Sequence, residues 1–256
     1  MNKILLIGDN CTDVFIYGDC YRLNPEAPTP VLCETHRMQF DGMAGNVLKN
    51  LQALGLDADF LTHKEEIIKT RYVDEKSNYI LLRIDNDNYG SRTKPIQKIE
   101  TLDISTYDLT IISDYDKGFL DEKELKIIFK KSKISFIDTK KPLDNWLDDV
   151  TFIKINEAEF HNPKNNVSYM FTKLNKKLIV TLGDGGAMYN QEIFKPTRKV
   201  MVRDVAGAGD TFLAAVAGHY LLHKDIREAI KFANICSGQV VSKKGIAYPN
   251  EKLIWM

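Results

Sequence analysis

Residues 203–212 read Arg-Asp-Val-Ala-Gly-Ala-Gly-Asp-Thr-Phe, and an apolar stretch that reaches Leu222 follows them. The small residues 206–209 let the backbone approach a ligand closely. Because the first amides of a helix lack intrahelical partners, they would face an anion such as a phosphate there. Asp210 in the first turn would then stand beside that phosphate and deprotonate an attacking hydroxyl. A plain helix start with an acidic first turn explains the same short motif, so both interpretations stay open at this point.

Around this stretch the chain alternates strand-like and helical segments. Apolar runs predict strands over residues 3–8, 109–113, 134–138, 151–155 and 177–182; helical spacing predicts helices over 44–54, 122–131, 208–222 and 226–242, with a short helix from Glu157. Such alternation is typical of a mostly parallel sheet with helices on both faces. Residues 10–36 and 71–84 break the alternation, and we expect them to form a small antiparallel sheet that acts as a lid. We expect a single domain over residues 1–256.

Polar residues close several of the predicted strands: Gly8-Asp9, Ser113-Asp114, Asn156 and residues 181–183. Ligands of parallel α/β sheets bind beyond the carboxyl ends of the strands. Asp9 and the nearby Asp13 are therefore candidates for binding ligand hydroxyls, although Asp13 would also serve as a turn cap. Asn156 and Glu159 equally fit a helix N-cap and its capping-box partner.

The composition argues against several classes of protein. The 256 residues carry 35 basic and 35 acidic side chains, and a net charge of zero argues against a general nucleic-acid binder. No apolar run reaches the ~20 residues that a membrane helix needs, and the N-terminus lacks a signal peptide, so we expect a cytoplasmic protein without a membrane partner. The four cysteines form no CxxC pair and no HExxH occurs, which argues against zinc. Walker, protein-kinase and complete dinucleotide-binding motifs are also missing.

Residues 206–210 resemble the C-terminal signature of the ribokinase-like (PfkB) carbohydrate kinases. Three further segments follow the order of that family: 42–46 (Gly-Met-Ala-Gly-Asn) resembles its sugar-holding GGxxxN segment, 156–159 (Asn-Glu-Ala-Glu) its NxxE motif, and 181–183 (Thr-Leu-Gly) its strand end beside the nucleotide. The resemblance implies a three-layer α/β ribokinase-like fold, with a mostly parallel central sheet flanked by helices and a small β-sheet lid. It also implies a kinase that uses ATP and Mg²⁺.

The resemblance assigns a role to each matching residue. Asp210 would be the catalytic base, and the amides of Gly207, Ala208 and Gly209 would form the anion hole. Gly42 and Asn46 would hold the sugar together with Asp9 and Asp13. The implied nucleotide-binding residues are Asn156, Thr181, Gly183, Gly207, Gly209 and, at the adenine, Asn234. Glu159 would act on Mg²⁺ through water, and Asp204 would lie near a monovalent cation such as K⁺.

A narrower resemblance covers residues 22–31, Arg-Leu-Asn-Pro-Glu-Ala-Pro-Thr-Pro-Val, which are similar to the RxSPEAPxPV segment of bacterial D-glycero-D-manno-heptose-7-phosphate kinases. Residues 8–13, 113–118 and 137–140 likewise resemble their GDxxxD, SDYxKG and IDPK segments. The resemblance implies phosphorylation of O1 of the heptose 7-phosphate by a homodimer joined through the lids. Arg22 suits a sugar phosphate bidentately and Lys117 suits it as a point charge, although either could be a plain surface residue.

The chain departs from these kinases in two places. Gly42-Met43 stands where the family has two adjacent glycines, and only a short connection separates Leu61 from Arg71, where the family places a helix and a further strand. Two alternatives therefore stay open: a kinase for another sugar or sugar phosphate, and a catalytically silent member that binds a sugar phosphate. No nucleotidyltransferase domain follows Met256, so we expect the kinase alone in this polypeptide.

Overall fold

The computed structural model of the chain describes residues 2–87 and 99–250. Eight strands form the main sheet in the order β12-β11-β10-β9-β8-β7-β1-β4. In that order their bounds are Glu192–Phe194, Ala187–Tyr189, Leu178–Thr181, Phe152–Asn156, Ser135–Thr139, Leu109–Asp114, Ile4–Gly8 and Asp59–Leu61. The strands from β10 to β4 pair in parallel, whereas β11 and β12 form an antiparallel edge. Their carboxyl ends therefore meet at one edge, as ligand binding in such sheets requires.

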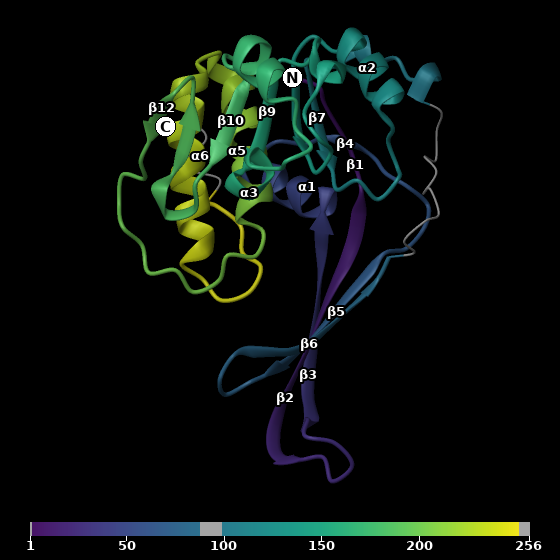
Figure 1. Ribbon diagram of the computed structural model, residues 1–256, viewed down its shortest axis with the longest axis vertical. Coiled ribbons are helices and arrows are strands. Elements are labelled where there is room, and N and C mark those ends of the chain that lie inside the picture. Colours follow the sequence, from purple (N-terminus) through teal and green to yellow (C-terminus); the bar gives the residue numbers. More distant parts are fainter. Residues whose placement is uncertain (1, 88–98, 251–256) are drawn as a thin grey trace.

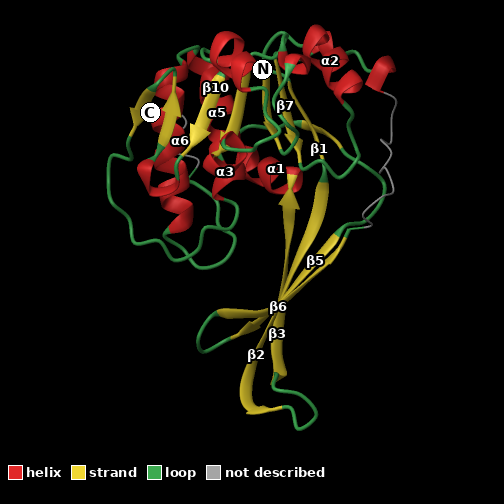
Figure 2. Cartoon of the chain, in the orientation of Figure 1, coloured by secondary structure: helices red, strands yellow, loops and turns green. Residues whose placement is uncertain are grey.

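Helices cover both faces of this sheet, which gives the body three layers (Figure 1, Figure 2). Ile4 and Leu6 of β1 pack into a core with α1 (Ala44–Ala53), α5 (Ala208–His223) and α6 (Ile226–Val241). Leu5 and Ile7 point the other way, into a core with α2 (Glu122–Lys131). A strand buried on both faces needs apolar residues at every position, which explains the unbroken run in β1.

Short helical turns complete the connections. They are α3 (Glu157–Phe160), α4 (Val167–Tyr169), the π-helical turn Met170–Leu174 and the 3₁₀ turns Ile99–Thr101, Ile104–Thr106, Asn145–Leu147 and Gly183–Gly185. Among the described residues, no helix combines the length and the apolar character needed to cross a membrane.

A second sheet of four strands extends away from this body (Figure 1). Its order is β3 (Pro30–Met43), β2 (Asn10–Leu23), β5 (Ile68–Asp74) and β6 (Tyr79–Asn86). Strand β2 begins shortly after β1, and β5 begins shortly after β4. Because β1 and β4 are parallel neighbours in the main sheet, β2 and β5 leave the body in the same direction. The two strands therefore pair in parallel.

The main elements agree with the sequence-based predictions. All five predicted strands and the four long predicted helices are present, with ends that differ by at most one residue. The expected antiparallel lid sheet was wrong in its pairing, because the second sheet is mixed: β2–β3 and β5–β6 are antiparallel and β2–β5 is parallel. Strands β4, β11 and β12 were not predicted, since three residues are too few to display a periodic pattern.

Candidate active site

Asp210 lies where two cavities meet, in the first turn of α5. The larger cavity, of about 460 Å³, opens over the carboxyl ends of β8, β9 and β10. The smaller cavity, of about 210 Å³, lies between the body and the base of the second sheet. Tyr115, Gly207 and Asp210 line both. Asp210 therefore stands at the boundary between a group bound in one cavity and a group bound in the other.

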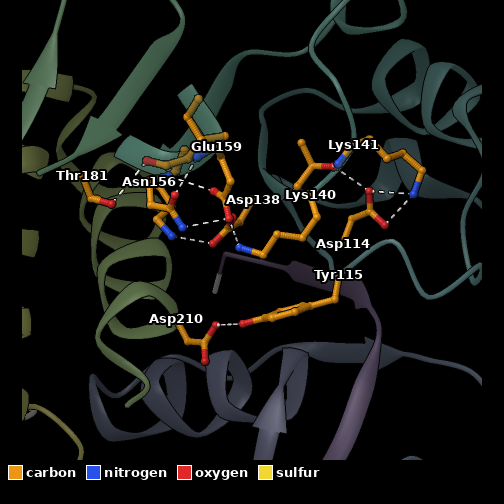
Figure 3. A network of polar contacts seen from close by, with 12 residues as sticks. Asp114, Tyr115, Asp138, Lys140, Lys141, Asn156, Glu159, Thr181 and Asp210 are labelled. Carbon is orange, nitrogen blue, oxygen red and sulfur yellow. Dashed lines mark hydrogen bonds and ion pairs between the residues drawn. The ribbon is translucent and has the colours of Figure 1, made fainter. Parts of the chain in front are cut away.

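Two hydrogen bonds hold the Asp210 carboxylate in place. The Tyr115 hydroxyl donates to Oδ1 at 2.9 Å (Figure 3). The Asn46 amide, on α1, donates to Oδ2 at 2.8 Å. Burial raises the pKa of Asp210 to about 6, although both hydrogen bonds act in the opposite direction. A carboxylate with this pKa is ionised at neutral pH yet more basic than an ordinary aspartate, which suits a general base.

The backbone before Asp210 forms a cradle for an anion. Gly207 has φ 77°, in the left-handed region, and a Cβ there would lie 2.7 Å from the Asn46 amide nitrogen, so a side chain would be both strained and crowded. No described side chain caps the start of α5, a helix of 16 residues. The Ala208 amide donates to the Val205 carbonyl at 3.3 Å, so within the described part of the chain the amides of Gly207 and Gly209 are the ones that a nucleotide phosphate would accept from.

The wall of the larger cavity includes five of the six predicted nucleotide-binding residues: Asn156, Thr181, Gly183, Gly207 and Gly209. Asn156 caps α3 through the predicted capping box. The Asn156 backbone amide donates to the Glu159 carboxylate at 2.8 Å, and the Glu159 backbone amide donates to the Asn156 side-chain oxygen at 2.8 Å. Glu159 also pairs with Lys140 (Figure 3). The capping and nucleotide-binding interpretations of Asn156 are therefore compatible in one geometry.

Magnesium would have few protein ligands here. No group of three or more His, Cys, Asp or Glu side chains gathers as a metal site in the described part of the chain. Mg²⁺ keeps several waters and takes most of its other ligands from substrate phosphates, so one or two carboxylates suffice. Asp138 fits such a role, since its buried Oδ1 in the cavity wall has no hydrogen-bond partner among the described residues. Glu159 does not line the cavity, and its carboxylate binds Lys140 and Asn156, so a contact with Mg²⁺ would run through water as predicted.

Basic side chains line the smaller cavity. Lys69 and Arg71 lie two residues apart on β5 and therefore share a face, and Arg83 of β6 is the register partner of Arg71. The Arg71 guanidinium pairs with Asp13 at 2.5 Å, which places Asp13 in the same wall. Lys69 is buried with its ammonium 5.6 Å from the centre of the Tyr115 ring. Arg83 pairs in turn with Asp85 at 2.6 Å, so two of the three cations have a carboxylate partner that an anionic ligand would share.

Gly42 and Met43 form the turn from β3 into α1. A Cβ on Gly42 would lie 2.3 Å from Asp13 Oδ2, so glycine is needed for Asp13 to approach. Met43 has φ 53° and ψ −130°, a conformation that costs a side-chain-bearing residue of order 1–3 kcal/mol. Its buried side chain packs with Cys11 and Ile67 and lines the smaller cavity. The departure from two glycines thus adds a side chain to the cavity wall at the expense of backbone strain.

Four predicted substrate-binding residues lie outside the walls of both cavities: Asp9, Arg22, Gly42 and Lys117. Asp9 is buried beneath Tyr115 and accepts its backbone amide at 2.7 Å, and burial together with Asp114 raises the pKa of Asp9 to about 6. Arg22 is exposed in the outer half of β2. Lys117 forms an ion pair with Asp87. Asp9 therefore supports the Tyr115 segment, and neither basic residue reaches the smaller cavity within one chain.

Two further predicted residues make contacts of their own. Asn234 is buried in α6 and donates to the Phe194 carbonyl at 2.7 Å, so it holds β12 and does not line the larger cavity. Asp204 accepts the Ala206 amide at 2.9 Å and the Gly245 amide at 3.2 Å. The adenine contact of Asn234 and the monovalent cation at Asp204 remain predictions.

Comparison with known proteins accords with this geometry. Residues 39–253 match the pfkB family of carbohydrate kinases. The chain belongs to that family. Membership makes the matched region a carbohydrate kinase domain, a phosphotransferase whose acceptor is a sugar hydroxyl.

Curated relatives of this pfkB-family chain include two proteins named Bifunctional protein HldE. The one from Nitratiruptor sp. is 30% identical, across 96% of this chain and 62% of its own length. The one from Campylobacter curvus is 31% identical, across 97% of this chain and 63% of its own length. The chain therefore spans less than two thirds of these relatives.

Solved structures share the fold. Arabidopsis thaliana ribokinase complexed with ribose and ATP superposes with a TM-score of 0.71 and 15% identity, over 100% of this chain and 98% of that one. Escherichia coli phosphofructokinase-2 in complex with potassium gives a TM-score of 0.73 and 13% identity, over 100% and 97%. The expected ribokinase-like fold, with a separate small sheet, is thereby confirmed.

Sequence reasoning missed several residues that line the two cavities: Tyr115, Asp138, Lys140, Lys154, Lys69, Arg71 and Arg83. Tyr115, Asp138 and Lys140 stand inside segments that resemble the family, but no role was assigned to them. Lys154 had a local signal, because a lysine inside the apolar run Phe152–Asn156 has to be compensated. The basic residues of β5 and β6 gave none, since their meeting depends on sheet register.

Proposed function

We propose that this domain transfers the γ-phosphoryl group of ATP to a phosphorylated sugar, and that the acceptor is O1 of D-glycero-D-manno-heptose 7-phosphate. The carrying observation is the set of three cations, Lys69, Arg71 and Arg83, around the cavity that adjoins Asp210. Arg71 and Arg83 each have a carboxylate partner, Asp13 and Asp85, so an acceptor phosphate would bind Lys69 and share the two guanidinium groups with those carboxylates. The HldE-named relatives and the segment at residues 22–31 support the heptose as the sugar.

The geometry divides the work between the two cavities. The acceptor would place its hydroxyl against Asp210, with other hydroxyls near Asp13 and its phosphate toward the base of the second sheet. The nucleotide phosphates would occupy the larger cavity with their terminal oxygens on the amides of Gly207 and Gly209. Asp210 takes the proton of the acceptor hydroxyl, and Asn46 and Tyr115 keep its carboxylate aimed. Bound Mg²⁺, held through Asp138 and Glu159, would supply charge neutralisation to the phosphates.

An ATP-coupled assay with three acceptors tests this function. We expect kcat/KM to be highest for D-glycero-D-manno-heptose 7-phosphate, lower for fructose 6-phosphate and lowest for ribose. Arg83→Met should lower kcat/KM for the heptose phosphate by roughly 10- to 100-fold, the range of one charged hydrogen bond, and should affect ribose little. Arg37→Met serves as the matched control, since Arg37 is exposed on the same sheet, lines neither cavity and pairs with Glu34, as Arg83 pairs with Asp85.

Each alternative has its own signature in that assay. A preference for ribose or fructose 6-phosphate would assign the chain another acceptor. Binding of the heptose phosphate without turnover of any acceptor would identify a catalytically silent member. Equal effects of Arg83→Met on phosphorylated and unphosphorylated acceptors would remove the argument from the basic cavity.

The second sheet is proposed to act as the lid of the acceptor site and as a dimer interface. The distal end of β2 and the edge strand β6 carry exposed apolar side chains: Tyr21, Leu23, Tyr79, Ile80, Leu81, Leu82 and Ile84, with Tyr79 73% exposed. An apolar sheet with an open edge recruits another chain. We propose a homodimer in the cytoplasm in which the second sheets of two copies cover each other.

Sedimentation at micromolar concentration tests the dimer. The double variant Tyr79→Lys, Leu81→Lys should sediment as a monomer, because the two charges would be buried in the interface. Val167→Lys, Phe171→Lys is the matched control, since these residues are similarly exposed on the body. A monomeric wild type, or a dimer that withstands both lysines of the second sheet, contradicts the proposal.

A further inference from the structure

His219 and His223 form a histidine pair near the end of α5 that the roles described so far leave unexplained. They are one helical turn apart, so their side chains lie on the same face of the helix. The ring centres are 4.3 Å apart and the ring planes are inclined by 35°. At a rise of about 1.5 Å per residue, Asp210 lies about 14–20 Å away along the same helix. The pair lines neither cavity and is therefore separate from the site described above.

The packing of His219 does not account for a histidine at this position. Its ring packs on Phe232 of α6, with ring centres 4.8 Å apart. His219 Nδ1 is buried and has no hydrogen-bond partner among the described residues. A leucine or phenylalanine would make the same apolar contact without leaving a buried polar atom unpaired. The imidazole therefore costs stability here, as functional groups commonly do.

The two imidazoles have the spacing of a metal-chelating pair. Histidines at positions i and i+4 of a helix are the spacing that the HExxH motif of zinc enzymes uses, although Tyr220 stands where that motif has glutamate. Zinc–nitrogen bonds of about 2.0–2.1 Å at a tetrahedral angle place two ligand nitrogens roughly 3.3 Å apart. Rings whose centres are 4.3 Å apart can present nitrogens at that separation. Burial and the neighbouring His223 lower the pKa of His219, which keeps its imidazole in the neutral form that binds metals.

Acidic side chains of α6 provide negative charge next to the pair. Glu228 is one turn before Phe232, so it lies on the same face of α6 as the ring that packs on His219. Glu228 and Asp225 both raise the pKa of His219 against the effect of burial, which places the two carboxylates within electrostatic range. The Glu228 carboxylate pairs with Lys231 at 2.7 Å, and both side chains are about half exposed, so turning it toward a cation costs little. The negative end of the α5 dipole also favours a cation here.

We propose that His219 and His223 bind a divalent first-row transition metal of the zinc class, and that Glu228 supplies the third ligand. Two imidazoles and a carboxylate suit Zn²⁺, Cu²⁺ and Ni²⁺ and discriminate against Mg²⁺, which prefers oxygen ligands. Water would complete the coordination at this partly exposed position. The bound ion would join the last turn of α5 to the first turn of α6, and so stabilise the helical pair that carries Asp210.

Calorimetric titration of tag-free, chelator-treated protein with ZnCl₂ tests the site. Millimolar Mg²⁺ in every sample occupies oxygen ligands without competing for imidazole. We expect one zinc ion to bind, and His223→Ala to weaken its binding at least ~10-fold, since the loss of a residue that only orients a ligand already costs that much. His223 is exposed, so its removal leaves the packing of His219 in place. Glu228→Gln should weaken zinc binding by a smaller factor.

His36→Ala is the matched control and should bind zinc as the wild type does. His36 is half exposed and lies 3.9 Å from the Glu75 carboxylate, but its ring stacks on Tyr17 instead of on a histidine. A loss of affinity confined to His223→Ala and Glu228→Gln therefore identifies the α5–α6 site, and not any exposed histidine beside a carboxylate.

Thermal unfolding gives a second measurement that does not depend on enzyme activity. Zinc should raise the Tm of the wild type, because it binds the folded state, and should raise the Tm of His223→Ala much less. Equal zinc affinity in wild type and His223→Ala, or a wild type that binds no zinc, overturns the proposal. Equal affinity in wild type and Glu228→Gln overturns the assignment of the carboxylate. Neither measurement uses an acceptor or ATP, so failure of the proposed kinase function would leave both results unchanged.

Discussion

Replacing Asp210 by Asn should inactivate the protein and stabilise it at the same time. The amide keeps the size of the side chain and can still accept from Asn46, but it cannot take a proton. We expect kcat to fall at least ~10²-fold, as for the loss of a general base. Nucleotide binding should be nearly unchanged, since the cradle amides are backbone groups.

The stabilisation follows from the raised pKa. Burial raises the pKa of Asp210 from 3.8 to about 6, so the folded state resists ionisation of this carboxyl. Below about pH 4 the group is protonated in both states and no stability is lost. As the pH rises through about 6, the folded protein must ionise a group that the unfolded chain ionises easily, and about 3 kcal/mol of stability is lost. Asp210→Asn should recover up to that amount at about pH 8, and roughly half of it at about pH 5.

Urea unfolding at the two pH values measures the effect. Asp57→Asn, at an exposed position outside both cavities, is the control and should leave stability and activity unchanged. A variant no more stable than wild type at about pH 8 would show that the carboxylate is not under strain from burial. Near-normal turnover would show that another group is the base.

Three further predictions concern the same region. The kcat/KM of wild type should rise with pH up to about 6 and then level off, because Asp210 must be ionised to accept a proton, and a profile flat down to about pH 5 would contradict this. Tyr115→Phe removes a hydrogen-bond donor that lowers the pKa of Asp210, so the rise in kcat/KM should move to higher pH by up to about one unit. An unchanged pH profile would show that the hydrogen bond from Tyr115 to Asp210 is absent in solution. Met43→Gly should raise the KM for the acceptor, because the side chain lines the smaller cavity. It should lower the free energy of unfolding by less than the ~2–5 kcal/mol of an ordinary buried Met→Ala truncation, because relief of backbone strain offsets the lost packing. A full loss of that size in urea unfolding would show that the Met43 backbone is unstrained.

The body of the fold could be predicted from local patterns. Strands β1, β7, β8, β9 and β10 appear in the sequence as short runs of mostly apolar residues, because a strand covered by helices on both faces buries side chains on both sides. The helix start at Ala208, with Asp210 in its first turn, was also predictable, since a helix start after small residues is a local feature. The capping box of Asn156 and Glu159 belongs to the same class, as it spans only four residues.

Only the tertiary structure decided which distant residues complete the site. Asn46 and Tyr115 meet Asp210 across 164 and 95 residues, and nothing in the sequence around either one indicates that contact. The basic cavity depends on the register of β5 against β6, where a shift of one residue would turn Arg83 to the other face. Arg22 and Lys117 were chosen as phosphate ligands because their residue type is suitable, but residue type does not determine distance. Sequence therefore determined the chemistry that the chain offers at each strand end, and packing determined which of those groups share one cavity.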